Sequence, residues 1–352
     1  MKKIRIADKW IGDGEPVYTI AEAGANHDSE LGKAFKLIDA AVEAQADSIK
    51  FQTYNASKLT TRTAKKYWED GISGETQYDV FEKLDKLTDS DWKEIFDYAK
   101  KKNVTCFSTP FDYQSVDLLY SLEVPAFKIA SADITHLPLI RKIAKKKLPV
   151  ILSTGMASLE EVDAAVGSVE DEGNGDIIIM HCITSYPTKP EDAHLELIKV
   201  LREHYPNYVI GYSDHTLGTD IPVFSTFYGA CCIEKHFTFD QSLTTSRDHR
   251  LSLGPQEFQE MVAKLKLARI SKGSTKRLEF DSEKEAVKYA RRSIVSTCKI
   301  PLGTVITPEM LDIKRPGTGI EPKNFEKIIG AKSTRDINED VPIVWEDIEI
   351  QK

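Results

Sequence analysis

The strongest constraint on the fold is an alternation of short β-branched runs with helical stretches, repeated eight times in one series. The eight expected strands are 17–22, 48–53, 104–109, 126–130, 149–153, 176–180, 209–213 and 232–237. The last helical stretch begins at Pro255 and ends at about Ile270. Eight βα units predict an α/β protein built as a (β/α)8 TIM barrel. A doubly wound sheet is the alternative, although it rarely needs eight units. Residues 4–10 are expected to form a small hairpin that closes the bottom of the barrel.

The composition of the sequence and its βα pattern change after Ile270. Residues 271–286 are polar and charged, which is typical of a linker. Short strand-like runs with Gly and Pro turns follow, so residues 287–352 predict a small β-rich module near the lower size limit for independent folding. The expected domains are therefore 1–270 and 287–352, joined by the linker 271–286.

The charge balance and the cysteines restrict the partners and the compartment. The 352 residues carry 47 Lys and Arg against 55 Asp and Glu, a net charge of −8. This argues against nucleic acid or an anionic membrane as the main partner, but not against a small anion in a local basic pocket. No apolar run is long enough for a membrane span or a signal peptide. Five cysteines without a CxxC motif indicate reduced thiols and a cytoplasmic protein.

Polar side chains gather at the ends of the expected strands, where barrels place their chemistry. Lys50 and Lys128 would be buried charges, which are costly without an anionic partner. Each lysine can form an internal salt bridge with Glu22 or Glu234. The alternative that we favour is a phosphate or carboxylate site, because it also explains the hydroxyl donors Thr109, Ser131, Ser153 and Ser213. In such a site, removal of one lysine from the clustered positive charge is expected to raise thermal stability.

Two histidines are expected to point inward from neighbouring strands. His215 follows the strand 209–213, and His236 shares one face of its strand with Glu234. A single histidine is usually structural, but two imidazoles with Glu22 or a ligand oxygen can hold a divalent cation. The spacing is not that of a closed zinc site. Open positions and oxygen ligands favour Mn²⁺ or Mg²⁺.

A series of short motifs gives the chain a family resemblance. They are IAEAGANH (20–27), SIKFQT (48–53), FSTPF (107–111), FKIAS (127–131), ILSTGM (151–156), HC (181–182) with YP (186–187), GYSDHT (211–216) and IEKHFT (233–238). Together and in this order they resemble the sialic acid synthase (N-acetylneuraminate synthase) family. The runs RRSI (291–294) and KRPGTGI (314–320) resemble the antifreeze-like SAF domain of that family, a small β-clip module.

The resemblance implies a reaction. Such synthases condense phosphoenolpyruvate with an open-chain hexosamine, commonly N-acetylmannosamine, and depend on Mn²⁺ or Mg²⁺. The products are a nine-carbon sialic acid and phosphate. The resemblance also implies a homodimer in which the SAF domain of one chain caps the barrel of its partner.

The resemblance further assigns roles to residues of this chain. His215 and His236 would hold the metal, and Glu22 would orient or deprotonate a water. The residues assigned to phosphoenolpyruvate are Lys50, Thr109, Lys128, Ser131, Ser153 and Ser213. The residues assigned to the sugar are Gln52, Asp133, Tyr186, Asp248 and Arg315.

Four departures from the family pattern lie near the expected sugar site. Asp133 stands where the family often has Glu, Gly254 also stands where Glu is common, Ser246-Arg247 replaces a usual Gly-Pro, and Ile183-Thr184 replaces Thr followed by Ser or Asn. The sugar therefore stays open between N-acetylmannosamine and a precursor of legionaminic acid, pseudaminic acid or a 9-phosphate product.

Two other functions remain as hypotheses. A Schiff-base aldolase would use Lys50 or Lys128 and need no metal. A carbohydrate-binding or ice-binding protein is suggested by the C-terminal module, but binding alone does not require so many ionisable groups at strand ends.

Overall fold

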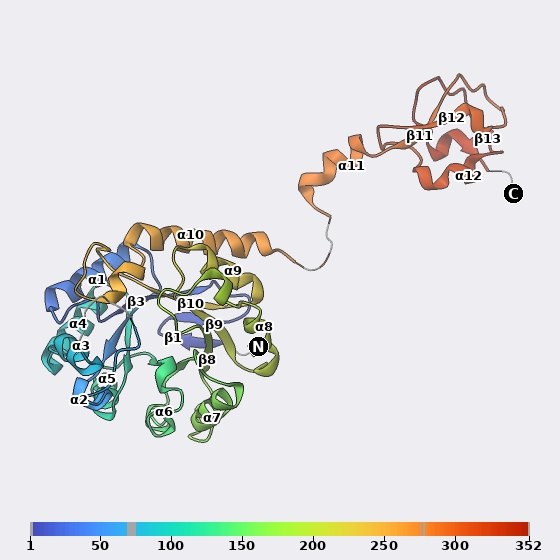
Figure 1. Ribbon diagram of the computed structural model, residues 1–352. Coiled ribbons are helices and arrows are strands. Elements are labelled where there is room, and N and C mark those ends of the chain that lie inside the picture. The colour runs from blue at the N-terminus through green and yellow to red at the C-terminus, as the bar shows by residue number, and fades with distance from the viewer. Residues whose placement is uncertain (1–2, 69–74, 275, 277–278, 351–352) are drawn as a thin grey trace. The chain divides into compact units, whose positions relative to one another are not determined.

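The computed structural model describes residues 3–68, 75–274, 276 and 279–350 (Figure 1). The chain divides into two compact units, Met1–Gly273 and Ser274–Lys352. The division falls inside the predicted linker 271–286. No helix of the described residues has the length and apolarity needed to cross a membrane.

The first unit is a closed barrel of eight parallel strands. They pair in the order β10-β3-β4-β5-β6-β7-β8-β9. The strands are β3 (Tyr18–Gly24), β4 (Ser48–Thr53), β5 (Thr105–Pro110), β6 (Phe127–Ile129), β7 (Val150–Ser153), β8 (Ile177–Cys182), β9 (Val209–Asp214) and β10 (Cys232–His236). This confirms the predicted TIM barrel and excludes the doubly wound sheet. The register pairs Glu22 with both His236 and Lys50, so polar residues of adjacent strands lie at one level.

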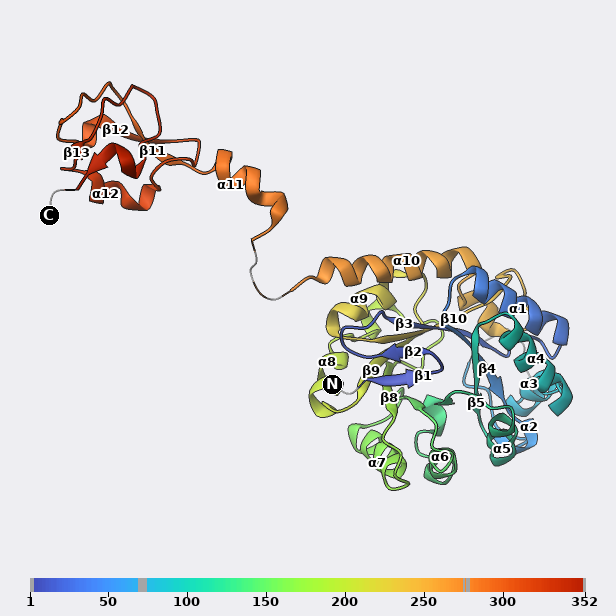
Figure 2. The ribbon, with the colours of Figure 1, turned by 180° about the vertical axis from the view of Figure 1, so that it is seen from behind.

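Helices follow the strands and surround the barrel (Figures 1 and 2). They are α1 (Leu31–Glu43), α4 (Asp89–Lys101), α5 (Tyr113–Ser121), α6 (Leu137–Ala144), α7 (Leu159–Glu170), α8 (Leu197–His204), α9 (Asp220–Tyr228) and α10 (Pro255–Lys272). Local sequence sets several starts: Thr88 and Ser158 form capping boxes at α4 and α7. Between β4 and α4 the chain makes an excursion with α2 (Ala56–Leu59) and α3 (Gln77–Leu84).

The barrel bottom is closed by the predicted hairpin. Strands β1 (Ile4–Ile6) and β2 (Lys9–Ile11) pair antiparallel. Ile4, Ile6 and Ile11 belong to the same apolar core as the strands and their helices. The hairpin therefore buries apolar surface that would otherwise be exposed at this end.

The second unit has its own small core of Ile, Leu and Ala side chains. Its elements are α11 (Lys284–Ala290), β11 (Ser293–Ser296), β12 (Leu311–Lys314), α12 (Phe325–Ile328), β13 (Lys332–Ser333) and β14 (Ile348–Glu349). Short 3₁₀ helices of this unit lie at Asp281–Glu283, Pro308–Met310, Pro322–Asn324 and Trp345–Asp347. The end of the predicted linker is helical, because 281–286 lack Gly and Pro and Asp281 pairs with Lys284 one turn on. The strand-like run 341–344 forms only an isolated bridge, at Pro342.

A buried histidine in the loop after β3 makes stability depend on pH. Burial against Phe51 and Trp92 lowers the pKa of His27 from 6.5 to about 4. Between these values the unfolded chain binds a proton that the folded chain does not, so stability falls as the pH falls from 6.5 to 4. The loss approaches about 3 kcal/mol. We expect the stability of His27→Asn to depend less on pH than that of the wild type, measured by thermal unfolding from pH 7 to pH 4. An equal dependence on pH in the two proteins would contradict the role of His27.

Candidate active site

A cavity of about 590 Å³ opens at the carboxyl ends of the barrel strands. It brings together thirteen of the fourteen residues that the sequence nominated: Glu22, Lys50, Gln52, Thr109, Lys128, Ser131, Asp133, Ser153, Tyr186, Ser213, His215, His236 and Asp248. The fourteenth, Arg315, lies in the second unit, directly after β12. Strand alternation therefore located the inward faces of the barrel correctly.

Four buried charges form an ion cluster at the centre of the cavity. The Lys50 Nζ lies 2.7 Å from Glu22 Oε2 and 3.6 Å from Glu234 Oε1, and the Lys128 Nζ lies 3.1 Å from the same Glu234 oxygen. These are the internal salt bridges that the sequence left as the less favoured alternative. With two lysines against two carboxylates, the description of the lysines as clustered, unopposed positive charge is wrong.

The two carboxylates of the ion cluster differ in their proton affinity. Burial raises the pKa of Glu22, although Lys50 opposes the shift. Burial also favours protonation of Glu234, but Lys128 and Lys50 outweigh it and lower the pKa of that carboxyl to about 2. The pKa of Lys50 is raised by the two carboxylates against the effect of burial. Glu22 is therefore the group suited to carry a proton, and Glu234 the permanent anion.

Hydroxyl groups surround the ion cluster. The Lys50 ammonium donates to Thr109 Oγ1 at 3.0 Å, and Ser213 Oγ donates to Glu234 at 3.3 Å. Ser131 Oγ accepts from the Gly155 N–H, while Ser153 Oγ is buried without a hydrogen-bond partner. A buried hydroxyl of this kind is costly unless a ligand supplies the missing hydrogen bond.

The two nominated histidines lie side by side with ring centroids 5.3 Å apart. His215 Nδ1 lies 2.7 Å from the Ile183 carbonyl, which can only accept, so Nδ1 carries the proton and Nε2 keeps its lone pair. His236 Nδ1 is buried without a hydrogen-bond partner. Imidazole nitrogens that keep a lone pair are suitable ligands for a divalent cation, so this pair fits a metal.

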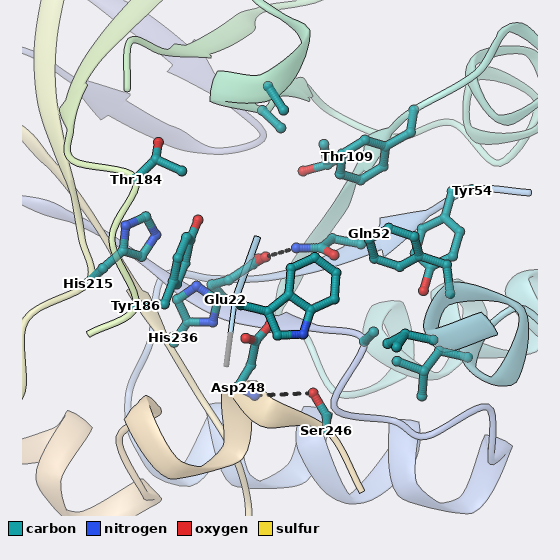
Figure 3. A pocket seen from close by; sticks show the side chains of 18 of the residues that line it. Glu22, Gln52, Tyr54, Thr109, Thr184, Tyr186, His215, His236, Ser246 and Asp248 are labelled. Carbon is teal, nitrogen blue, oxygen red and sulfur yellow. Dashed lines mark hydrogen bonds between the residues drawn. The ribbon is translucent and has the colours of Figure 1, made fainter. Parts of the chain in front are cut away.

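The donor set for such a metal is incomplete within the chain. Among residues 3–68, 75–274, 276 and 279–350, no three His, Cys, Asp or Glu side chains are arranged to hold an ion. Glu22, one of the two candidates for a third ligand, instead accepts from Gln52 Nε2 at 2.9 Å (Figure 3). It also pairs with Lys50. A metal on the two imidazoles would keep open positions for water and substrate, as catalytic sites require.

Three other nominated residues that line the cavity are Tyr186, Asp133 and Asp248. Figure 3 labels Tyr186 and Asp248. Tyr186 packs against His215 with ring centroids 4.1 Å apart. Asp133 ends the 3₁₀ helix Ser131–Asp133, and burial raises its pKa to about 7. Asp248 lies in the 3₁₀ helix Arg247–Leu251, where its N–H donates to Ser246 Oγ. These groups can accept from hydroxyl or amide N–H groups of a ligand.

Several cavity residues were missed from the sequence. Glu234 was considered only as a partner for the lysines. Thr184, whose Oγ1 is buried without a partner, follows β8 and was noted only as a departure. Strand alternation beyond Cys182 would have found it. Tyr54, Trp68 and Phe81 come from the excursion between β4 and α4. This segment has no periodic hydrophobic pattern from which cavity residues could be predicted.

Two family models match the chain. Residues 37–277 match the NeuB family, and residues 291–349 match the SAF domain. The chain is 37% identical to the spore coat polysaccharide biosynthesis protein SpsE of Bacillus subtilis, over 99% of this chain and 98% of that protein. It is 36% identical to the N,N'-diacetyllegionaminic acid synthase of Legionella pneumophila, with 96% of each covered. Among solved structures, the N-acetylneuraminic acid (sialic acid) synthetase of Leptospira borgpetersenii aligns with a TM-score of 0.74 at 33% identity, covering 81% of this chain and 95% of that one.

The two curated relatives align over both units of the chain. The similarity therefore extends through the barrel and the C-terminal module in one order. The predicted motifs and the two family matches agree on the same assignment. The chain thus belongs to the NeuB family, the sialic acid synthase family that its motifs resemble, and carries a C-terminal SAF domain.

Proposed function

We propose that the protein condenses phosphoenolpyruvate with an open-chain N-acylated amino sugar in a metal-dependent reaction. C3 of phosphoenolpyruvate bonds to the aldehyde carbon, water adds at C2, and the C2–O bond to phosphate breaks. The products are a nonulosonic acid and inorganic phosphate. One observation carries the proposal: two buried lysines with hydroxyl donors lie in the same cavity as two adjacent imidazoles.

The anion end of the cavity suits phosphoenolpyruvate. Lys50 and Lys128 supply positive charge, and Ser153 has a hydroxyl that is buried without a partner. When a trianionic substrate enters, each lysine can turn part of its charge from the carboxylates to the ligand. The same charges stabilise the phosphate as it leaves.

Glu22 is placed to handle the water that adds at C2. Its carboxyl is buried, its pKa is raised by that burial, and Gln52 and Lys50 hold its two oxygens. A carboxylate with a raised pKa is a better base than an exposed one. Glu22 can therefore take a proton from the attacking water, while Glu234 stays ionised beside the lysines.

The metal site completes the proposed chemistry. His215 and His236 would hold Mn²⁺ or Mg²⁺, which when bound polarises the aldehyde oxygen for attack. The Ile183 carbonyl fixes the tautomer of His215, and Tyr186 packs against its ring. These contacts hold the imidazole in one orientation before a metal binds.

The sugar is less defined than the reaction. Relatives of nearly equal identity are named for different products, a diacetyllegionaminic acid in one case and sialic acid in the other. N-acetylmannosamine and the precursors of legionaminic, pseudaminic or 9-phosphorylated products are all consistent with the reaction. We also propose the domain-swapped homodimer and the cytoplasmic location that the sequence suggests.

The test is a phosphate-release screen of amino sugars with phosphoenolpyruvate, run with Mn²⁺, with Mg²⁺ and with chelator. Release that needs both a sugar and a metal is the expected result. Metal-independent turnover with borohydride trapping of a carbonyl substrate would favour the Schiff-base aldolase instead. Sugar binding without phosphate release would favour a binding protein.

Removal of one lysine of the ion cluster should weaken both substrate binding and the fold. In Lys128→Met the Glu234 carboxylate keeps the Ser213 hydroxyl and the 3.6 Å contact to Lys50, so a buried charge loses its closest cation. We expect a loss of about 3 kcal/mol in stability and a raised KM for phosphoenolpyruvate. This reverses the gain in stability expected from the sequence. Thermal unfolding and steady-state kinetics measure the two effects, and an unchanged KM would remove Lys128 from the anion site.

Asp133 should make sugar binding depend on pH. Burial raises its pKa to about 7, so the side chain is neutral below that pH and a carboxylate above it. A carboxylate accepts hydrogen bonds from sugar hydroxyls more strongly than the neutral acid. We expect the KM for the sugar to fall as the pH rises from 6 to 8, and to stay flat in Asp133→Asn. The KM for phosphoenolpyruvate serves as the internal control. An identical pH profile in the variant would remove Asp133 from the sugar site.

A further inference from the structure

A buried ion pair lies behind the two histidines, on the outer side of the barrel wall. Asp214 directly precedes His215, and Lys235 directly precedes His236. Asp214 and Lys235 are register partners on β9 and β10. Because side chains alternate along a strand, the histidines line the cavity (Figure 3), while the ion pair points the opposite way, toward the surrounding helices. The exposed fraction of each side chain of the pair is 0%.

The Asp214 carboxylate is the centre of a hydrogen-bond network around the backbone of His215. Its Oδ1 accepts from the Tyr212 hydroxyl at 2.9 Å and from the Thr216 N–H at 3.1 Å. Its Oδ2 accepts from Thr216 Oγ1 at 2.9 Å and from the Lys235 ammonium. The same ammonium donates to the Thr216 carbonyl. The two residues that flank His215 are therefore bonded to each other and to strand β10.

Apolar side chains fill the same layer on other strands of the barrel. The outward-facing neighbours of the polar cavity residues on β3, β4, β6 and β7 all belong to the apolar core: Ala23, Phe51, Ile129 and Leu152. A buried ion pair often adds no stability over apolar residues of similar volume, because the cost of desolvation offsets the attraction. A fully hydrogen-bonded polar network instead fixes one arrangement of the segments that it joins. Stability alone therefore does not account for the charges at this place.

We propose that Asp214 and Lys235 are positioning residues, which hold the His215 and His236 imidazoles in the relative arrangement that binds the metal. The proposal rests on the metal-dependent condensation proposed above. The ring centroids of the two histidines lie 5.3 Å apart, and a shared ion requires both rings to stay within about 0.5 Å of the productive arrangement. The register of β9 with β10 extends to the ion pair, one residue before each histidine. The ion pair thus joins the two backbones directly beneath the rings.

The test measures metal affinity and stability separately in Asp214→Asn. Asparagine keeps the volume of the side chain and one oxygen, but loses the charge that pairs with Lys235. We expect the dissociation constant for Mn²⁺, measured by equilibrium dialysis, to rise about 10- to 100-fold, the usual effect of losing a group that holds a metal ligand in place. The KM for phosphoenolpyruvate at saturating Mn²⁺ should not change, because Lys50 and Lys128 keep their contacts.

Asp47→Asn is the matched control. Asp47 is also a carboxylate that joins two strands, since it accepts from the N–H and hydroxyl of Thr19 and from Lys9, but it lies at the amino end of β4. This variant should lose stability in thermal unfolding and keep the wild-type dissociation constant for Mn²⁺. A wild-type dissociation constant in Asp214→Asn would overturn the proposal and leave the ion pair a structural role only. If Asp214→Asn does not fold, Thr216→Val decides, because it removes only the Oγ1 hydrogen bond: a raised dissociation constant supports the proposal, and an unchanged one overturns it.

Failure of the proposed condensation would give a different result. Suppose that Mn²⁺ binds to the wild type, more weakly to His236→Ala and to Asp214→Asn, and that no amino sugar gives phosphate release. The proposed reaction is then wrong and the positioning role stands. If the wild type binds Mn²⁺ no more tightly than His236→Ala, the histidine pair is not a metal site, and both proposals are overturned.

Discussion

His236→Ala should retain its fold and lose nearly all turnover. The side chain lies at the end of β10 and its Nδ1 is buried without a hydrogen-bond partner, so its loss removes the proposed metal ligand without breaking a hydrogen bond to that nitrogen. Polarisation of a carbonyl by a metal is worth several kcal/mol, and each 1.36 kcal/mol is a factor of ten in rate. We therefore expect kcat to fall by about 10³-fold in the phosphate-release assay with saturating Mn²⁺.

The metal content separates this expectation from a general loss of structure. His181→Ala is the matched control, because His181 is a buried histidine of β8 that bonds the Ala193 carbonyl and does not line the cavity. Equilibrium dialysis should show that the wild type and the control bind Mn²⁺, and that His236→Ala binds it much more weakly. Near-normal turnover with bound metal in His236→Ala would remove His236 from the ligand set.

The barrel could be predicted from the sequence because its signals are local. Each strand is a short β-branched run, and capping boxes such as those at Thr88 and Ser158 set helix starts within four residues. Strand alternation then determines which side chains face inward. The two short helices between β4 and α4 were not predicted, because α2 and α3 pack against each other and neither has a long periodic pattern.

The residues of the candidate site were predicted better than the contacts between them. Alternation placed Lys50, Lys128 and Glu234 at the strand ends, but the choice between ion pairs and an unopposed positive cluster depends on angstrom-scale distances. The sequence contains no such distances, so the salt bridges to Glu234 were ranked too low. Aromatic residues that line the cavity were missed for a related reason, since Phe81 and Phe111 are thirty residues apart in the sequence and both pack against Tyr54.

Replacement of Arg315 is also expected to abolish activity. Mixed dimers test whether Arg315 acts on the barrel of the partner. The residue is exposed and follows β12, in a turn held by Ser293, whose Oγ donates to the Pro316 carbonyl. A held turn with an exposed arginine is suited to presenting that side chain to a sugar in another domain. If the proposed homodimer exchanges its SAF domains, Arg315→Ala alone and His236→Ala alone should both be inactive, because each site needs both residues.

Co-refolding the two inactive variants in equal amounts then gives opposite results for the two arrangements. Random pairing makes about half of the dimers mixed. In a swapped dimer, Arg315 of the His236→Ala chain contacts the barrel of the Arg315→Ala chain, whose two histidines are intact. One of the two sites in the mixed dimer is therefore complete. Phosphate release should therefore reach about a quarter of the wild-type rate. Lys323→Ala, an exposed cation of the same unit, is the control and should stay fully active. If mixed dimers are shown to form and no activity returns, each site retains one defect, and Arg315 must act on the barrel of its own chain.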